Sequence, residues 1–470
     1  MAADLYKKLL EYKKSGVYPF HMPGHKMGQC FEMGNFFDLD ITEIDGFDNL
    51  HNPKGIIYEA QKKYARLFGA QETFFSVNGS SGALIAAIMA VCGNGEKIIA
   101  ARNCHRSVYS AFVLSGAVPV YVMPEYIEDT GVVGGILPSS LKKAVLENPD
   151  AKAVIITSPT AEGIVSDIRE IARITHEAGM TLIVDEAHGS HFKFCEIFPD
   201  TALECGADIV VQSAHKTLPS PTQTSVLHLG MGGKKYFYNI KETLSVIETS
   251  SPSYVFMAAL DLCRDYIENN GAEDYRKYSF NLTEFRKSLK NLINMSLLDK
   301  NICGKYGIKN IDVSKIVVVS DKADCVKIKE ILRKNHNIEL EMACRSHFVA
   351  ISTVCDKPEG FKRLKEAIID VDKSIKSYKI LYTDYKYNVP CLKLSPREAF
   401  YHKKRSVGFE ECEGMVCGEF VIPYPPGIPI IAPGEIITKK SLDIVKDFYN
   451  SGVEITGVKD RFIKKITVLD

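Results

Sequence analysis

Features that mark membrane proteins and nucleic-acid-binding proteins are missing from this 470-residue chain. Its longest apolar run, ALIAAIMAVC at 83–92, is too short to cross a bilayer, and the charged N-terminus lacks the apolar core of a signal peptide. Lysine plus arginine and aspartate plus glutamate each number 58, so no net charge favours nucleic acid or an anionic membrane. The sequence therefore predicts a soluble, cytoplasmic protein with neither of these partners.

Two further absences narrow the chemistry. The thirteen cysteines include no CxxC, and an odd number in a long chain is not typical of a disulfide framework. We therefore expect buried, reduced thiols and no metal site. The letters DEAH at 185–188 match a helicase motif, but a helicase also requires a GxxxxGK[ST] loop, which the chain lacks.

A regular alternation of helix-like and strand-like segments is present between about 56 and 230, and it is typical of a parallel sheet. The predicted strands are 71–77, 96–101, 151–158, 180–186 and 207–213. The predicted helices are 55–69, 80–92, 107–116 and 168–179. We predict an α/β fold with a mostly parallel sheet covered by helices, which binds its ligands beyond the carboxyl ends of the strands.

Changes of pattern divide the chain into three parts. We predict an N-terminal arm at 1–50 that begins with an amphipathic helix at 4–14, a large domain at 51–290 and a smaller C-terminal α+β domain at 291–470. The smaller domain reads as strand, helix, two strands and helix, at 315–320, 323–336, 338–343, 347–353 and 359–378. The proline-rich stretch 423–435 is an ordered loop or a flexible linker, and its tyrosine and isoleucines favour order.

Two predicted strands end in side chains that are unusual beside an apolar run. In VVQSAHKTLP (210–219), Lys216 follows a buried strand, and lysine is seldom buried because desolvating an ammonium is costly. Lys216 is therefore either a solvated surface group or a reagent. In LIVDEAHG, Asp185 ends a strand and Ala187 would share its face, although Asp185 could also simply cap the next segment.

Two helix starts carry further polar groups. NGSSG places Ser80 and Ser81 at a helix N-terminus, which suits a phosphate but is also what an ordinary N-cap looks like. His105 lies between a strand and a helix, where a histidine is more often structural than catalytic. His21 and His25 in HMPGHK cannot align on a helix because of Pro23 and Gly24, so we interpret this segment as a packing or interface loop.

One cofactor accounts for all of these groups together. Pyridoxal 5′-phosphate needs a lysine for its Schiff base, an anion site for its phosphate and a carboxylate to keep its ring nitrogen protonated. Lys216, the serines at 80–81 and Asp185 supply these three requirements at strand ends of one sheet. We therefore interpret Lys216 as a reagent rather than a surface group.

The order of motifs resembles the bacterial ornithine/lysine/arginine decarboxylases of the aspartate-aminotransferase fold, and among them the shorter biosynthetic arginine decarboxylases. The matching segments, which span 20–435, are FHMPGHK, TEIDGFDNLHNPKGII, NGSSG, RNCHRS, SPTAEG, VDEAHG, SAHKTL, SSPSY, SPREAF and PYPPGIPIIAPGE. Residues 290–385 show no family motif. The family often has an aromatic residue where Ala161 stands, which leaves the substrate side of the site open.

The resemblance implies a role for each matching residue. Lys216 would form the Schiff base, Asp185 would pair with the ring nitrogen, His105 would stack on the ring and Ala187 would pack on its other face. The phosphate would be held by Ser80, Ser81, Ser213 and His215. His188 would lie near the substrate, Glu419 would hold the distal cation of the substrate, and the TSSPSY segment of a partner subunit would complete the site.

The activity that the resemblance implies is decarboxylation of a basic amino acid to an amine and carbon dioxide, feeding polyamine synthesis in a homodimer or larger oligomer. Arginine is the first expectation, followed by lysine and ornithine. An aminotransferase, an aldolase or a β-lyase of the same fold is the alternative, because Lys216 and Asp185 serve all of them alike. Arg397 in SPREAF could bind an α-carboxylate, as an aminotransferase requires. A decarboxylase-like regulator without turnover is a further alternative, which the intact set of Lys216, Asp185 and His105 argues against.

Overall fold

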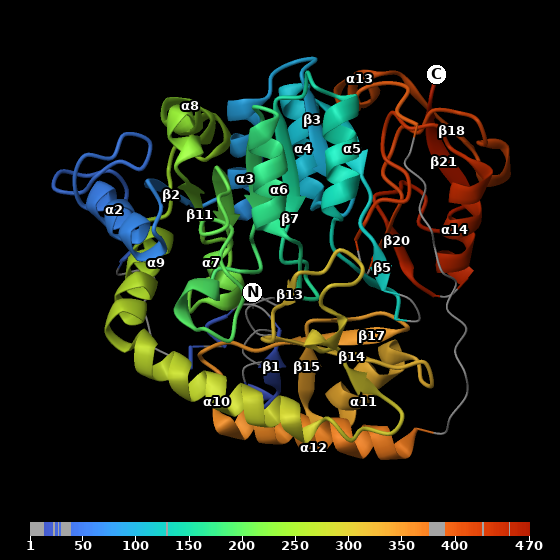
Figure 1. Cartoon of the computed structure of the whole chain (residues 1–470). Coiled ribbons are helices and arrows are strands. Elements are labelled where there is room, and N and C mark those ends of the chain that lie inside the picture. Colours follow the sequence, from blue (N-terminus) through green and yellow to red (C-terminus); the bar gives the residue numbers. More distant parts are fainter. Residues whose placement is uncertain are drawn as a thin grey trace, which may run out of the picture.

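The computed structural model describes residues 14–21, 24–26, 28–29, 39–127, 130–375, 391–424, 427–450 and 452–470. At its centre is a seven-stranded sheet in the order β2-β11-β10-β9-β7-β3-β4 (Figure 1). These strands are β2 (Glu72–Ser76), β3 (Lys97–Ala101), β4 (Val118–Val122), β7 (Ala153–Thr157), β9 (Thr181–Asp185), β10 (Ile209–Gln212) and β11 (Ser225–Leu229). Only β11 of these seven runs against the others, so the predicted mostly parallel α/β sheet is confirmed.

Helices cover both faces of this sheet, as Figure 1 shows. One face packs on α3 (Gly79–Val91) and α4 (Arg106–Ser115), and the other on α5 (Pro138–Glu147) and α6 (Ile168–Glu177). Side chains alternate between the two cores because successive residues of a strand point to opposite faces. In β9, Ile183 enters the core of α3 and α4, whereas Val184 enters the core of α5 and α6. Asp185 therefore follows Ile183 on the α3 and α4 side.

Further helices extend the large part of the molecule. They are α2 (Ile56–Phe68), α7 (Ala214–Thr217), α8 (Phe237–Ile247), α9 (Tyr254–Tyr266) and α10 (Ala272–Ser288). A π-helical turn, Ile267–Gly271, joins α9 to α10. The expected helix at 55–69 and strand at 71–77 are confirmed by α2 and β2, and Gly69 ends α2 in the left-handed conformation that glycine adopts without strain.

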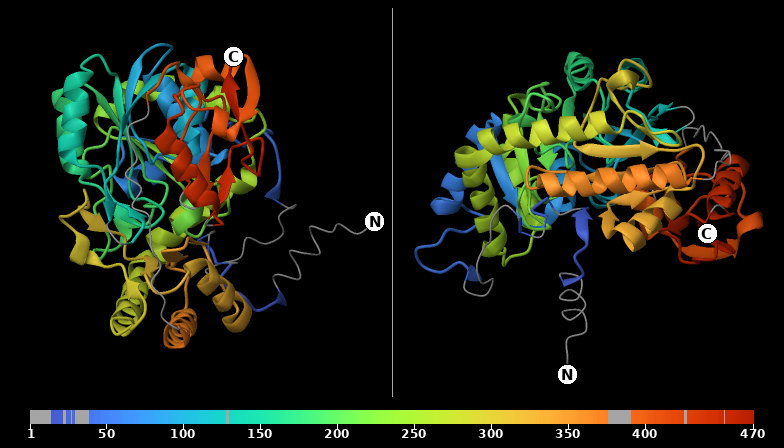
Figure 2. Two further views of the ribbon diagram at one scale, coloured as in Figure 1. Left: turned by 90° about the vertical axis from the view of Figure 1, so that its right-hand side faces the viewer. Right: turned by 90° about the horizontal axis from the view of Figure 1, so that it is seen from below.

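A second, antiparallel sheet follows α10, in the order β12-β14-β17-β16. Its strands are β12 (Ser296–Leu297), β14 (Lys315–Val319), β16 (Met342–Ala343) and β17 (His347–Ile351). It packs on α11 (Cys325–His336) and α12 (Pro358–Ser374), as the sequence pattern predicts. Seen from below, α10 and α12 lie side by side across this face (Figure 2).

Short strand pairs connect the two sheets and the arm. β1 (Tyr18–Phe20) runs parallel to β15 (Ile338–Leu340), and β8 (Ile164–Val165) pairs with β13 (Asn310–Ile311). β5 (Tyr126–Ile127) and β6 (Val132–Val133) form a further antiparallel pair. The segment read as one strand at 338–343 is therefore two strands, because Glu341 interrupts it between β15 and β16.

The last eighty residues form a compact unit with its own hydrophobic core (right side of Figure 1). It contains α13 (Pro396–Tyr401), β18 (Lys404–Gly408), β19 (Ile422–Tyr424), α14 (Lys439–Asn450), β20 (Glu454–Thr456) and β21 (Lys465–Leu469). The prediction of order in 423–435 is confirmed where the structure describes it, since Ile428, Ile430 and Ile431 are buried. The three domain boundaries read from the sequence stay a prediction.

Some expectations meet the limits of the described residues. Apart from Lys14, the helix predicted at 4–14 lies outside them. Eleven described cysteines are free, but Cys355 is disulfide-bonded, which corrects the expectation of fully reduced thiols. In the described part of the chain, no helix is both long and apolar enough to cross a membrane.

Candidate active site

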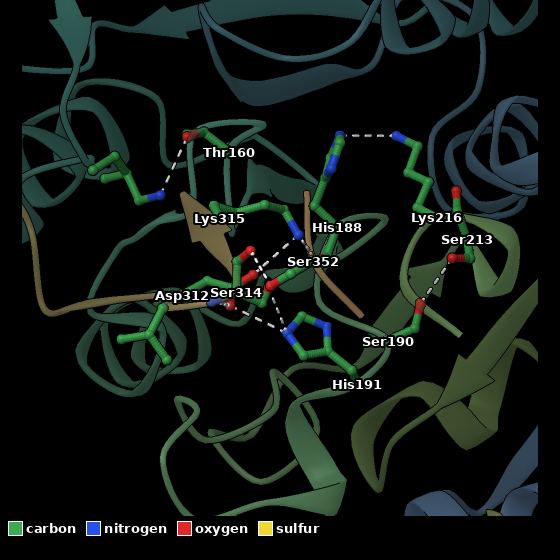
Figure 3. A network of polar contacts seen from close by, with 12 residues as sticks. Thr160, His188, Ser190, His191, Ser213, Lys216, Asp312, Ser314, Lys315 and Ser352 are labelled. Atoms are coloured by element: carbon green, nitrogen blue, oxygen red, sulfur yellow. Dashed lines mark hydrogen bonds and ion pairs between the residues drawn. The ribbon is translucent and has the colours of Figure 1, made fainter. Parts of the chain in front are cut away.

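Lys216 lies on α7, the single helical turn that follows β10. Its Nζ is 2.9 Å from Nε2 of His188, and the side chain is half-buried (Figure 3). Burial lowers the pKa of Lys216 below its usual range, and the nearby Lys315 cation lowers it further, although Asp185 and Glu341 oppose this. A lysine amine with a lowered pKa is more often neutral, which is the form that attacks a carbonyl.

Asp185 ends β9 and is almost fully buried. Its Oδ1 accepts a hydrogen bond of 3.1 Å from the backbone N–H of Ala187, so the carboxylate is fixed in direction. Asp185 pairs on one side with Thr157, the last residue of β7, and on the other side with Val211, the last but one of β10. The carboxylate thus lies at the carboxyl edge of the sheet, where the chain reaches Lys216 one strand later.

The N-terminus of α3 contributes a polar surface to the same edge. Asn78 precedes α3 but makes no capping hydrogen bond with its side chain, and within the described residues no backbone acceptor is found for the N–H groups of Ser80 and Ser81. Ser213, which precedes α7, donates from its Oγ to the Oγ of Ser80 at 2.8 Å. Two hydroxyls and two free N–H groups therefore meet at a positive helix end.

His105 caps α4, and its exposed ring is held in one orientation. The backbone N–H of Ser107 donates to Nδ1 at 3.2 Å, so the hydrogen of the neutral ring lies on Nε2. Surrounding protein atoms lower the pKa of His105, as does the charge of Lys216, while Asp185 raises it. The ring is therefore neutral near pH 7 and lies within electrostatic range of both predicted catalytic groups.

His188 connects Lys216 to a network that the sequence did not reveal (Figure 3). Burial lowers the pKa of His188 far below its usual value, and the cations of Lys216 and Lys315 add to this effect. Its backbone carbonyl accepts a hydrogen bond of 3.3 Å from Nζ of Lys315. Lys315 in turn lies 3.1 Å from Oδ2 of Asp312, and both side chains are completely buried.

His191 completes this network from the other side. Its Nε2 lies 3.1 Å from Oδ1 of Asp312 and 3.1 Å from Oγ of Ser314. Lys315, together with His191 and hydrogen bonds from Ser314, lowers the pKa of Asp312 strongly against the opposing effect of burial. Lys315 begins β14 and Asp312 lies between β13 and β14, in the region where no family motif was found, so no local signal pointed to them.

The described residues of the FHMPGHK segment pack against α7. Gly24 donates from its N–H to the carbonyl of His215 at 2.7 Å, and a Cβ at this position would come 2.5 Å from the Leu218 carbonyl oxygen. Lys26 is fully buried and donates to three carbonyls, those of Pro19, His21 and Ile351. The interpretation of this segment as a packing loop is therefore confirmed.

One ring nitrogen of His215 is hydrogen-bonded within the protein. Its Nδ1 lies 2.9 Å from the carbonyl oxygen of Thr224, to which it donates. Burial lowers the pKa of His215. In the neutral ring, Nε2 is then an acceptor, so holding a phosphate through this nitrogen requires the ring to be protonated.

Two predicted substrate residues are not brought together with Lys216 in the described chain. Glu419 is buried and accepts hydrogen bonds from the backbone N–H groups of Thr467 and Lys459, and from the Thr467 hydroxyl. Arg397 on α13 donates to the carbonyl of Leu114 at 2.8 Å, at the end of α4. Glu419 therefore links segments of the C-terminal unit to one another, and Arg397 links this unit to the end of α4. The contact of either side chain with a substrate stays a prediction.

Ala161 lies in a tight turn beside the Lys315 network. The Thr160 N–H donates to the Ile164 carbonyl at 3.0 Å, and Gly163 packs so closely that a Cβ would come 2.9 Å from Cγ of Lys315. Ala161 is half-buried at this turn. The turn in which the family often has an aromatic residue therefore packs against Lys315, which contacts the His188 carbonyl.

This sheet, with a lysine, an aspartate and a helix N-terminus at its carboxyl edge, has the α/β fold of solved lysine decarboxylases. Its fold matches lysine decarboxylase LdcF of Francisella novicida with a TM-score of 0.79 and 20% identity, over 99% of this chain and 81% of that one. The constitutive lysine decarboxylase of E. coli matches with a TM-score of 0.77 and 18% identity, over 100% and 82% of the chains.

Sequence comparison then identifies the family. The models of the major and C-terminal domains of the Orn/Lys/Arg decarboxylases match residues 3–331 and 380–454. The arginine decarboxylase of Bacillus subtilis (strain 168) is 34% identical, covering 99% of this chain and 97% of that protein. The arginine decarboxylase of Bacillus anthracis is 35% identical over the same shares. The chain belongs to the Orn/Lys/Arg decarboxylase family.

Proposed function

We propose that this protein decarboxylates arginine to agmatine and carbon dioxide, with pyridoxal 5′-phosphate bound at Lys216, and that the product feeds polyamine synthesis. The observation that carries the proposal is the Lys216 amine, whose pKa is lowered and which lies 2.9 Å from His188 at the edge that also holds Asp185. Arginine is preferred over lysine and ornithine because arginine decarboxylases are 34–35% identical over nearly the whole chain.

The residues present fit the cofactor. The free N–H groups of Ser80 and Ser81, with the Ser213 hydroxyl, suit a phosphate, and the buried Asp185 suits a protonated pyridine nitrogen. The small Ala187 side chain and the His105 ring lie near the same carboxylate. When bound, the cofactor supplies an electron sink for the carbon that loses its carboxylate.

The protein groups then divide the remaining work. Asp185, fixed by the Ala187 N–H, keeps a positive charge on the ring nitrogen favourable. Lys216 and His188, 2.9 Å apart and both with lowered pKa values, form a pair between which a proton can move. We propose that this pair takes up the proton that the α-ammonium of the substrate gives up on binding, and that it would deliver this proton to the α-carbon in place of the carboxylate.

The test is an assay of purified protein with pyridoxal 5′-phosphate and, separately, arginine, lysine and ornithine. We expect carbon dioxide and agmatine from arginine without any keto acid present. Lys216→Ala should abolish turnover and prevent borohydride trapping of the cofactor on the chain, because the neighbouring Lys315 amine is held by Asp312. Lys234→Ala is the matched control, because Lys234 is exposed and follows β11 at the edge of the sheet opposite to Lys216. Turnover of lysine or ornithine alone would overturn the choice of substrate.

An aminotransferase remains the alternative within the fold, and Arg397 was its supporting residue. The guanidinium of Arg397 is engaged by the Leu114 carbonyl, so it offers less support for a carboxylate site than the sequence indicated. Requirement of a keto acid in the assay above would favour this alternative.

The proposal includes a homodimer or larger oligomer in the cytoplasm, with the TSSPSY segment of one subunit facing the site of another. In the described chain, Tyr254 of this segment donates from its hydroxyl to the carbonyl of Asp48, which joins it to the TEIDGFDNLHNPKGII segment. Two segments that match the family thus meet on one surface. Light scattering of the purified protein would measure the oligomeric state.

A further inference from the structure

The turn between β16 and β17 brings together a thiol and an imidazole that the proposed decarboxylation does not use. Sγ of Cys344 lies 3.1 Å from Nδ1 of His347 and 3.3 Å from Oγ of Ser346. His347 Nδ1 also lies 3.0 Å from Oγ of Ser346, so the three groups form a closed cluster. His347 and Ser346 are buried, whereas Cys344 keeps part of its surface in contact with solvent.

The charges of this cluster favour an ion pair. Burial raises the pKa of the Cys344 thiol, but His347 and the hydrogen bond from Ser346 outweigh it and bring the pKa down to about 7. Burial lowers the pKa of His347, but Cys344 and the carboxylate of Glu162 raise it above its usual value. The two partners shift in opposite directions, as expected for a thiolate beside an imidazolium.

The other groups around Cys344 do not supply this charge. Cys325 on α11 faces Cys344, and burial raises the pKa of its thiol, so it stays protonated. Arg345 is directed to Asp324, with 3.9 Å between Nε and Oδ2. Glu162, on the turn that carries Ala161, acts on His347 and raises its pKa. His347 is therefore the cation that stabilises the thiolate.

We propose that Cys344 is a modification site for peroxides. Its thiolate attacks one peroxide oxygen, the O–O bond breaks, and a sulfenic acid and hydroxide form; the hydroxide takes up a proton to become water. Sulfur is oxidised by two electrons and the peroxide is reduced by two. The sulfenic acid has lost the negative charge that held His347 protonated, so the change reaches Glu162 beside Ala161.

The first test measures alkylation of each cysteine by iodoacetamide on the unaltered protein, by peptide mass spectrometry between pH 6 and pH 9. With a pKa of about 7, the Cys344 rate should rise about 2-fold from pH 7 to pH 9, against about 25-fold for a thiol of pKa about 8.5. Cys391, which is exposed, is the internal reference. A rise of about 25-fold at Cys344, or no labelling there at all, would overturn the proposal.

The second test treats the protein with hydrogen peroxide and traps sulfenic acid with dimedone. We expect an adduct on Cys344, its loss in Cys344→Ser, and slower formation at pH 7 in His347→Gln, whose alkylation profile should shift to higher pH. Dimedone adducts found only on other cysteines, or an unchanged profile in His347→Gln, would contradict the role of the pair. The alkylation profile and the dimedone adduct are both measured on the unaltered protein, so the outcome does not depend on how either variant folds.

Discussion

Lys216, which is half-buried, and Lys315, which is buried, differ in how their charges are compensated. Lys315 has a carboxylate partner, Asp312, at 3.1 Å, and also donates to the His188 carbonyl. Lys216 is 2.9 Å from the neutral His188 ring, and its pKa is lowered. A paired cation can remain charged in a low-dielectric site, whereas an unpaired amine gives up its proton. In the proposed function, Lys315 is a fixed charge and Lys216 is the reagent.

Lys315→Met should therefore affect Lys216 as well as stability. Removing the cation takes away one cause of the lowered pKa of Lys216, so that pKa should rise. The rate at which the cofactor-free protein takes up pyridoxal 5′-phosphate, followed by absorbance, should then reach its half-maximum at higher pH. We also expect kcat/KM for the proposed reaction to fall by roughly 10- to 100-fold, because the His188 backbone loses its support.

Lys309→Met is the matched control for this change. Lys309 is exposed and pairs with Asp167 at the surface, six residues before Lys315. Its removal should leave both the pH profile and kcat/KM unchanged. A pH profile for Lys315→Met that coincides with that of Lys309→Met would show that Lys315 has only a structural role.

At the scale of elements, the N-terminus of α2 is capped by the carboxylate of Asp48, a residue that precedes the helix in the chain. Asp48 accepts hydrogen bonds from the backbone N–H groups of Lys54, Gly55, Ile57 and Tyr58, with distances from 2.7 to 3.2 Å. These N–H groups have no partner inside the helix, so Asp48 does the work of an N-cap from outside it. The TEIDGFDNLHNPKGII segment is thus a loop folded around the start of α2.

Asp48→Asn should lower the free energy of unfolding by about 1–2 kcal/mol at pH 7, the cost of losing a helix cap. Burial raises the pKa of Asp48, but the backbone N–H groups outweigh it and lower the pKa below its usual range. The carboxylate therefore contributes stability that is fully present above the pKa of the unfolded chain, about 3.9. The difference from wild type should shrink as pH falls below about 4, which urea unfolding at several pH values would measure.

Asp45→Asn provides the control for Asp48→Asn, because Asp45 lies exposed in the same segment. It should change stability by less than about 0.5 kcal/mol at every pH. Equal losses in the two variants, or a loss in Asp48→Asn that does not depend on pH, would refute the capping role.

For the whole molecule, a buried ion pair joins the C-terminal unit to the central sheet. Arg102, directly after β3, makes a two-pronged ion pair with Glu435, in which NH2 lies 2.9 Å from Oε2. The guanidinium also lies 4.6 Å from the ring centre of Tyr121. Because Arg102 precedes His105 by three residues, the docking of the C-terminal unit also positions the loop that carries His105.

Glu435→Gln should destabilise the protein by about 3–5 kcal/mol, because it leaves the Arg102 guanidinium buried without its counter-charge. Urea unfolding would measure the loss. Glu410→Gln is the same substitution at an exposed pair with Lys446 on the C-terminal unit, and it should leave the urea midpoint almost unchanged. Similar costs at the two positions would contradict the importance of the buried pair.

The residues at the carboxyl edge of the sheet could be predicted because each of them lies in a short local motif. Asp185 and Lys216 follow apolar strands, and Ser80 begins an apolar helix, so periodicity alone places them at one sheet edge. The role of Glu419, which precedes the proline-rich motif, stays a prediction, and its carboxylate accepts hydrogen bonds from Thr467 and Lys459. A motif indicates where a side chain lies along the chain, but not which group it contacts in the folded protein.

The sequence by itself determined the parallel sheet, the edge at which its chemistry lies and the family, because strand periodicity and strand-end residues are properties of neighbouring positions. Only the tertiary structure decided what surrounds that chemistry. Lys315 reaches His188 across 127 positions and Arg102 reaches Glu435 across 333, and the carboxylate of Glu162, on a distant turn, raises the pKa of His347 against the effect of burial. Such contacts depend on how separate elements pack, and pairing energies between distant, buried charges leave no pattern along the chain.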